Sequence, residues 1–160
     1  MAYPTCDTLI QSFNTTHRII KMQTDGLTHA DSLRQLPFRG NCLNWVLGHI
    51  IAGRDGVLKL LSESAVWGES ETARYTSGSE PITGDKQALP FKKLLEDLDE
   101  SQRRIMETLA QSSPEALSMQ TERGEKTVGE LVAGLHWHET YHVGQLELLR
   151  QLAGKDDAII

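Results

Sequence analysis

Hydrophobic positions recur at steps of three and four residues over four stretches of the chain, the spacing of one face of an α-helix. The first stretch covers about residues 6–27, with Thr5 as its predicted N-cap. The second begins at Asn41 or Asn44, either of which suits an N-cap, and ends near residue 63. No stretch shows the alternation of a strand and no segment repeats another, so the pattern predicts an all-α protein.

The other two predicted helices lie in the second half of the chain. The third starts at Pro90, a residue suited to the first turn, and its apolar stripe continues to Leu109. Residues 113–115 then predict one short helical turn. The fourth begins with the capping box of residues 127–130 and ends near Leu152.

Residues 64–89, between the second and third helices, are rich in Ser, Thr, Gly and Glu and show no periodicity. Connections this long are usually functional or disordered, and Trp67 and Tyr75 indicate that part of this one is ordered and able to roof a site. Four amphipathic helices predict a four-helix bundle, here one domain over residues 1–160. The long crossover is compatible with parallel packing of helices two and three.

Composition and charge restrict the partners of such a bundle. Apolar residues make up 39% of the chain and charged residues 24%, as in soluble globular proteins. A net charge of −6 with scattered Lys and Arg argues against nucleic acid or an anionic membrane surface as a partner. The N-terminus lacks a signal-peptide pattern, no apolar run would span a bilayer, and two cysteines make no disulfide framework. We therefore expect a cytoplasmic protein.

The candidate chemistry lies in residues 136–145, which read HWHETYHVGQ. His138 and His142 are about 40° apart around a helix and one turn apart in height, so both imidazoles can reach one metal ion. They share a stripe with Leu135 and Leu149, which predicts that they face the interior of the bundle.

His49 is a third candidate, on the face of the second helix that carries Val46 and Val57. Bundle cores build metal sites from inward side chains of facing helices, so we predict a divalent metal site formed by His49, His138 and His142. Three imidazoles with an open fourth position suit zinc, and nickel or another divalent ion is also possible. The alternative is a buried cluster of three histidines without metal.

Residues 138–142 also match H-E-x-x-H, the pattern of zinc peptidases. The extended peptidase pattern requires glycine and histidine where this chain has Gln145 and Leu148, which disfavours a peptidase. Glu139 is rotated about 100° from His138, so its simplest roles are a partly exposed residue or a salt-bridge partner.

The remaining histidines are weaker candidates. His136 is about 200° from the predicted ligand line, which predicts a surface position or a subunit contact. We expect His17 to be a hydrogen-bonded core residue, with occasional ligation as the alternative, and His29 to lie at a helix end or in a loop.

Two motifs, NWVLGHI at residues 44–50 and HETYHVGQLELLRQLAG at residues 138–154, resemble the DinB-like (DinB/YfiT) metal-binding four-helix bundles. The order and spacing of the predicted helices and histidines match along essentially the whole chain. The resemblance implies that His49, His138 and His142 are the ligands. It also implies an up-up-down-down bundle and, in many members, a homodimer.

Characterised members of the family include metal-dependent transferases and isomerases that use low-molecular-weight thiols. The resemblance thus implies a thiol S-transferase acting on a small-molecule substrate, with the metal holding the thiol as thiolate. Tyr141 and Gln145 are candidates for substrate contacts or catalysis, with plain packing as an equal alternative. Two other functions stay open: a hydrolase that uses a metal-bound hydroxide with Glu139 as base, and a non-catalytic, stress-related metal-binding dimer.

Overall fold

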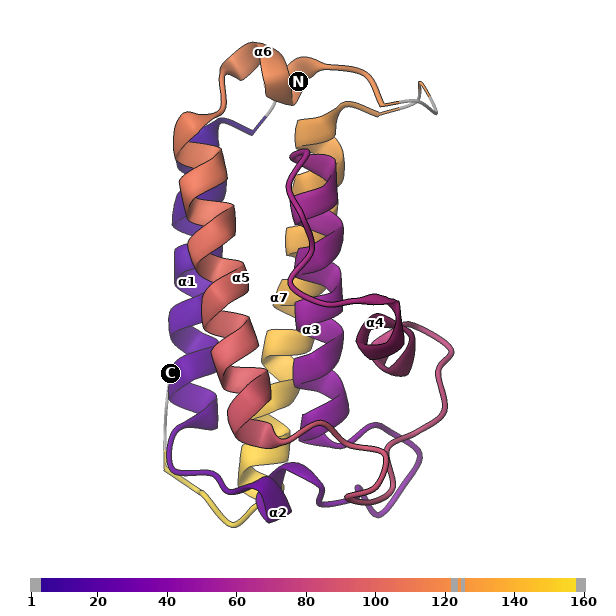
Figure 1. The fold of residues 1–160 in the computed structure, drawn as a ribbon. Helices are drawn as coiled ribbons and strands as arrows, with labels where there is room; N and C mark the ends of the chain where they lie inside the picture. Colours follow the sequence, from indigo (N-terminus) through magenta and orange to yellow (C-terminus); the bar gives the residue numbers. More distant parts are fainter. Residues whose placement is uncertain (1–3, 122–123, 125, 158–160) are drawn as a thin grey trace.

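Four long helices packed along one another form the body of the protein in a computed structural model that describes residues 4–121, 124 and 126–157 (Figure 1). Within these residues there is no strand, and only an isolated bridge joins Gln120 to Thr127. The predicted all-α four-helix bundle is confirmed. The long helices are α1 (Cys6–Thr24), α3 (Leu43–Leu60), α5 (Phe91–Gln111) and α7 (Val128–Leu152), and the short ones are α2 (His29–Ser32), α4 (Glu69–Tyr75) and α6 (Pro114–Ser118).

Hydrogen bonds between helices give their relative directions. Residue numbers rise together along α3 and α5 and along α1 and α7, so each of these pairs is parallel, whereas α1 and α5 run in opposite directions (Figure 1). The long crossover between the second and third long helices is therefore confirmed, together with their parallel packing. The bonds are Asn44–Leu89, Arg54–Ser101, Thr16–Glu139, Arg150–Gln23, Gln102–Asn14 and Cys6–Ser112.

The implied up-up-down-down order is wrong, because the long helices follow the order up, down, down, up. The cause is the connection of residues 25–42, which contains α2 and returns the chain at the same end of the bundle, so α3 runs opposite to α1 (Figure 1). The crossover that follows carries the chain back along the outside of α3. That path makes α5 parallel to α3 (Figure 1).

Two predicted N-caps are confirmed, whereas the predicted end of α1 is wrong. The Thr5 side chain caps α1 by accepting from the backbone N–H of Thr8, and Thr127 and Glu130 form a complete capping box at α7. The predicted extension of α1 to residue 27 is wrong, because α1 ends at Thr24 and Gly26 adopts a φ of +67° that no longer continues a right-handed helix.

The predicted N-cap of α3 is also wrong, because Cys42 occupies that position and Asn44 lies inside the helix. The Asn44 side chain is buried and makes bonds across the bundle rather than along its own helix. Its Nδ2 donates to the carbonyl oxygen of Leu89 at 2.9 Å, and its Oδ1 accepts from the Tyr75 hydroxyl at 2.9 Å. Asn44 thereby ties both halves of the crossover to α3.

The crossover of residues 61–90 is ordered by a buried carboxylate on α3. Asp55 accepts hydrogen bonds from the backbone N–H groups of Val66, at 2.7 Å, and Trp67, at 3.1 Å. The indole of Trp67 donates to Asp97 of α5 at 2.6 Å. These bonds hold the crossover beside α3 before it enters α4, a helix too short to show a hydrophobic period in the sequence.

Both cysteines are free thiols, and Cys42 is buried, which raises the pKa of its thiol. Across the described part of the chain, every helix is too short or too polar to cross a lipid bilayer.

Candidate metal centre

The three predicted ligand histidines meet between α3 and α7. His142 is buried as predicted, but the predicted inward position of His138 is wrong, because its side chain is exposed at the edge of the cluster. The Nε2 atom of His138 lies 3.0 Å from the Nε2 atom of His49 and 3.0 Å from that of His142. One ring nitrogen from each histidine lies within 4.8 Å of the other two. Zinc ligands at 2.0–2.1 Å in tetrahedral geometry are separated by about 3.3 Å, so this nitrogen set fits one ion with small side-chain shifts.

Two of the three imidazoles are oriented by carbonyl oxygens. The Nδ1–H of His49 donates to the backbone carbonyl of Tyr75 at 2.6 Å, and the Nδ1–H of His142 donates to Oε1 of Gln145 at 2.8 Å. Each bond places the proton on Nδ1 and leaves the Nε2 lone pair facing the centre, the arrangement common in metal-ligating histidines. The indole of Trp45 stacks on His49, with ring centroids 4.7 Å apart.

Burial favours the neutral form of His49 and His142. Desolvation lowers the pKa of His142 to about 4, with the neighbouring His49 and His138 acting in the same direction. Desolvation also lowers the pKa of His49. Because a metal binds neutral imidazole, the two rings need not lose a proton at pH 7 before they coordinate a cation.

Gly48 makes room for the residue that orients His49. A Cβ atom at Gly48 would lie 2.2 Å from Cδ1 of Tyr75, closer than side-chain atoms can approach. The Tyr75 ring is fully buried against this glycine, and its hydroxyl accepts from the backbone N–H of Leu89 at 2.8 Å. The close approach of ring to helix brings the Tyr75 carbonyl to the imidazole of His49.

Gly48→Ala is therefore expected to destabilise the protein, because the new methyl group must displace the Tyr75 ring, at a cost of about 1–3 kcal/mol. Gly53→Ala, in the same helix, is the matched control, since its Cβ would meet nothing within 4 Å. That change should stabilise the helix by about 0.5–1 kcal/mol. Urea unfolding followed by circular dichroism measures both, and equal effects of the two changes would contradict the role assigned to Gly48.

Glu139, the carboxylate within H-E-x-x-H, is buried in the bundle core, and its hydrogen bonds go to Arg54 and Thr16 and not to the histidines. Its two oxygens accept hydrogen bonds from Nε and Nη2 of Arg54 at 2.9 and 2.8 Å, and Oε1 also accepts from the Thr16 hydroxyl at 2.6 Å. Burial alone would raise the pKa of Glu139, but Arg54 and these hydrogen bonds outweigh it and hold the pKa below its usual value. The salt-bridge role is confirmed, and the partly exposed position is wrong.

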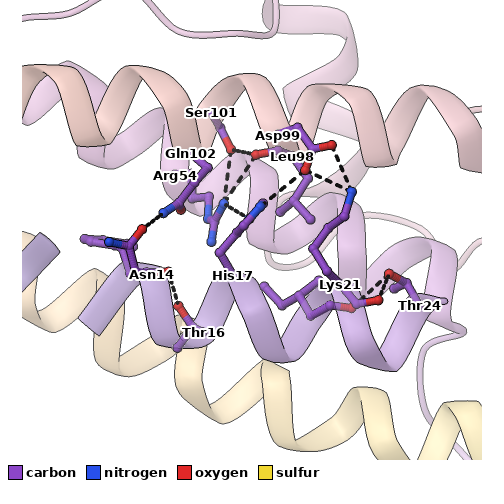
Figure 2. Close-up of polar contacts among 12 residues, drawn as sticks. Asn14, Thr16, His17, Lys21, Thr24, Arg54, Leu98, Asp99, Ser101 and Gln102 are labelled. Atoms are coloured by element: carbon purple, nitrogen blue, oxygen red, sulfur yellow. Dashed lines mark hydrogen bonds and ion pairs between the residues drawn. The ribbon is translucent and has the colours of Figure 1, made fainter. Parts of the chain in front are cut away.

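Arg54 connects all four long helices. It is fully buried, and its Nη1 lies 3.4 Å from Nδ1 of His17 on α1 and from the carbonyl of Leu98 and hydroxyl of Ser101 on α5 (Figure 2). Together with the ion pair to Glu139 on α7, these bonds satisfy a charge that would otherwise be strongly destabilising in the core. The network fixes the height at which α7 packs on α3, and hence the position of His138 beside Glu139.

His17 belongs to this network and lies apart from the three clustered histidines. Its predicted hydrogen bonding is confirmed, but the side chain is half-buried at the edge of the core and not inside it. Its Nδ1 accepts from Arg54, so Nε2 carries the proton and faces Oδ1 of Asp99 at 3.3 Å (Figure 2). Desolvation and the charge of Arg54 lower the pKa of His17 to about 4, with Lys21 adding to this effect and Asp99 and Glu139 opposing it.

This low pKa predicts a pH-dependent contribution to stability. Between pH 6.5 and about 4 the unfolded chain protonates His17 while the folded chain does not, so stability present above pH 6.5 is lost as the pH falls through this window. His17→Gln, which cannot titrate there, should lose less unfolding free energy between pH 7 and pH 5 than the parent protein. Chemical denaturation at the two pH values tests this, and identical losses would refute it.

The other candidate residues take different positions. Gln145 is half-buried and acts through its bond to His142, whereas Tyr141 is exposed, with its ring edge-on to that of His142. His136 is half-buried and not at the surface as predicted, because its ring packs edge-on against the buried Phe13, at a centroid distance of 4.8 Å. His29 starts α2, accepts from the backbone N–H of Phe91 and contacts Asp85.

A cavity of about 750 Å³ opens beside the three histidines. Of the crossover, only Ser77 lines it among the described residues. The side chains of Trp67 and Tyr75 are buried elsewhere, so the expected roof over the site is not formed by these aromatic rings. The other lining residues are Leu36, Pro37, Phe38, Arg39, Gly40, Asn41, Trp45, Val46, His49, His138, Tyr141, His142, Gln145, Leu148, Leu149, Gln151 and Leu152.

Comparison with known proteins places the chain by family. No curated protein matches it. The model of the DinB superfamily matches residues 13–146, a span that contains the three clustered histidines and the buried pair of Arg54 and Glu139. Because this match covers most of the 160 residues, the chain belongs to the DinB superfamily.

Proposed function

We propose that the protein is a metal-dependent enzyme of the thiol S-transferase type, with a divalent ion held by His49, His138 and His142. The observation that carries the proposal is the convergence of three Nε2 atoms beside a cavity large enough for a small molecule. Among the described residues only these three form such a cluster, so a coordination position would remain for a substrate atom, as in catalytic zinc sites. Zinc and nickel both suit imidazole ligands.

Some residues around the site would orient the imidazoles, and others would exclude water from them. Tyr75 holds His49 through its carbonyl, and Gln145 holds His142 through its amide oxygen. Trp45 and Leu149 provide apolar surface beside the ligands, which keeps water away from their uncoordinated faces. A bound divalent cation lowers the pKa of a thiol that it coordinates, which is the chemistry an S-transferase needs.

The hydrolase alternative loses its expected base. Both carboxylate oxygens of Glu139 are taken by Arg54 and Thr16, and the side chain is buried away from the cavity. The S-transferase proposal does not depend on this carboxylate. For this reason we rank it above hydrolysis.

The reaction is tested with zinc-loaded and nickel-loaded protein, a panel of low-molecular-weight thiols and a chromogenic electrophile. We expect product formation that requires both the thiol and the metal and that is lost in His142→Ala. Substrate cleavage at the same rate without any thiol would contradict the transferase and favour hydrolysis. Activity that survives both metal removal and His142→Ala would contradict any metal-dependent mechanism.

We also propose that one face of α7 forms a homodimer contact. Trp137, Tyr141 and Leu148 are 71%, 59% and 64% exposed and lie one above another at spacings of four and seven residues. Large apolar side chains gathered on one exposed helix face are typical of protein interfaces. This surface supports the dimer that the family resemblance implies.

Trp137→Glu is expected to shift the protein toward the monomer, because a charged group within an apolar contact would be buried without a partner. Light scattering coupled to size exclusion measures the change. Met119→Glu is the control, since Met119 is also exposed, at 63%, but lies beyond α6 and outside this face. A parent protein that is monomeric at all accessible concentrations would refute the dimer.

A further inference from the structure

We propose that the cavity beside the three histidines binds a small molecule with an apolar body and a single negatively charged end, which is the class of acceptor substrate for this site. The proposal deepens the proposed function and relies on it only for the role of this molecule as acceptor. The binding claim itself rests on the walls of the cavity and on the charge that they carry.

The cavity walls are mainly apolar. They come from three parts of the chain: the segment of residues 36–41, the first half of α3 and the second half of α7. The volume of about 750 Å³ lies in the range of small-molecule sites, about 300–1,000 Å³. A ligand with several negative charges would find one guanidinium in this lining, so its other charges would be buried without a counter-charge, which is costly. The apolar side chains of the lining include Phe38, Trp45, Val46 and Leu149.

The charge of the lining is opposite to that of the chain. The protein has 22 acidic residues and a net charge of −6, yet no Asp or Glu lines this cavity among the described residues. Arg39 is the one Lys or Arg in the lining, and within the described part of the chain it makes no hydrogen bond or ion pair. An anionic group therefore finds a free guanidinium, whereas a cationic group finds no counter-charge.

The same walls distinguish this ligand from a highly polar one. An apolar body would bury surface against Trp45, Val46 and Leu149 while its charged end reached Arg39 at the rim. A short polar anion could use Arg39 but would leave the apolar walls in water. Affinity should therefore depend on both the length of the apolar part and the sign of the charge.

The test uses four probes with the metal-free full-length protein: octanoate, butyrate, octylammonium and 1-octanol. Binding is measured by isothermal titration calorimetry and followed by the intrinsic tryptophan fluorescence, to which Trp45 in the cavity lining contributes. We expect octanoate to bind at least about tenfold more tightly than butyrate, because four more methylenes are partly buried. We also expect octanoate to bind at least about tenfold more tightly than octylammonium, because of Arg39.

Two variants separate the charge from the apolar walls. Arg39→Gln should weaken octanoate several-fold and leave 1-octanol unchanged, and Arg34→Gln, a nearby exposed arginine outside the cavity, should change neither. Phe38→Asp places a carboxylate in the lining and should reverse the preference between octanoate and octylammonium. Both altered residues are exposed, so neither change removes packing from the core.

Equal affinities for octanoate and octylammonium, or for octanoate and butyrate, would overturn the proposal, as would the absence of binding by any probe. Tyr141 and Leu148 line the cavity and also belong to the proposed dimer face, so the titrations are repeated with Trp137→Glu. Octanoate binding that is absent from the dimer but present in Trp137→Glu would show that a second copy covers the cavity, which also overturns the proposal. Because the probes are applied without metal or thiol, these outcomes are distinct from failure of the transferase: a protein that binds octanoate as expected but transfers no thiol would contradict only the proposed function.

Discussion

Arg54→Met is expected to lower the free energy of unfolding by about 3–5 kcal/mol, the largest stability effect that we predict for a single substitution. The side chain is fully buried, and two of its nitrogens neutralise the carboxylate of Glu139, which is itself buried. Without Arg54 the folded protein must keep an unpaired charge in its core or protonate it. Either outcome costs much of the stability that a domain of this size has.

A second change separates this cause from simple loss of packing. The double variant Arg54→Met with Glu139→Leu replaces both members of the ion pair, so no unpaired charge is left in the core. It should recover most of the stability that Arg54→Met alone loses. Arg103→Met is the control for an exposed pair, because Arg103 bonds Glu100 and Glu107 at the surface and should contribute no more than about 1 kcal/mol. Urea unfolding that shows similar small losses for Arg54→Met and Arg103→Met would contradict the role of the buried pair.

His138→Ala is expected to lower the affinity for zinc by more than about 100-fold, because it removes one of three ligands, whereas loss of an outer hydrogen-bond partner costs about 10–100-fold. His138 is exposed, so its removal should leave the metal-free fold as stable as before. Gln145→Leu removes the hydrogen bond that orients His142 and should therefore lower the zinc affinity by only about 10–100-fold.

The control for this prediction is a histidine outside the cluster. His17→Gln should bind zinc as the parent protein does, because His17 contacts Arg54 and Asp99 and is not part of the cluster of His49, His138 and His142. Competition titration with a chromogenic chelator measures all four proteins. Equal zinc affinity for the parent protein and His138→Ala would show that the ion binds elsewhere.

The histidine cluster could be predicted from sequence because its parts follow local rules. His138 and His142 are one helical turn apart, and His49 lies on the face of its helix that also carries buried Val46 and Val57. The start of α7 was equally predictable, because the capping box of Thr127 is a local pattern. The spacing of residues within two helices therefore predicted the three histidines, and the resemblance to the family implied that they are metal ligands.

The buried ion pair could not be predicted in this way, because its partners are 85 residues apart and each looks like a surface residue. One signal was present: Arg54 lies between Ile51 and Val57 on an apolar helix, where a charge must have a partner. Asn44 was misassigned for a similar reason, since its side chain bonds the distant Tyr75 and not its own helix end. Hydrogen bonds between residues that are distant in the sequence produce no periodic pattern along the chain, so the sequence alone does not predict them.

The metal content of untagged protein, purified without added metal or chelator, tests the central claim most directly. We predict about one divalent ion per chain by plasma mass spectrometry, removed by chelator and regained on incubation with zinc, and absent from a variant in which His49, His138 and His142 are all alanine. The claim would be contradicted by protein that carries no ion and takes up none, or by a triple variant that retains the same ion in the same amount.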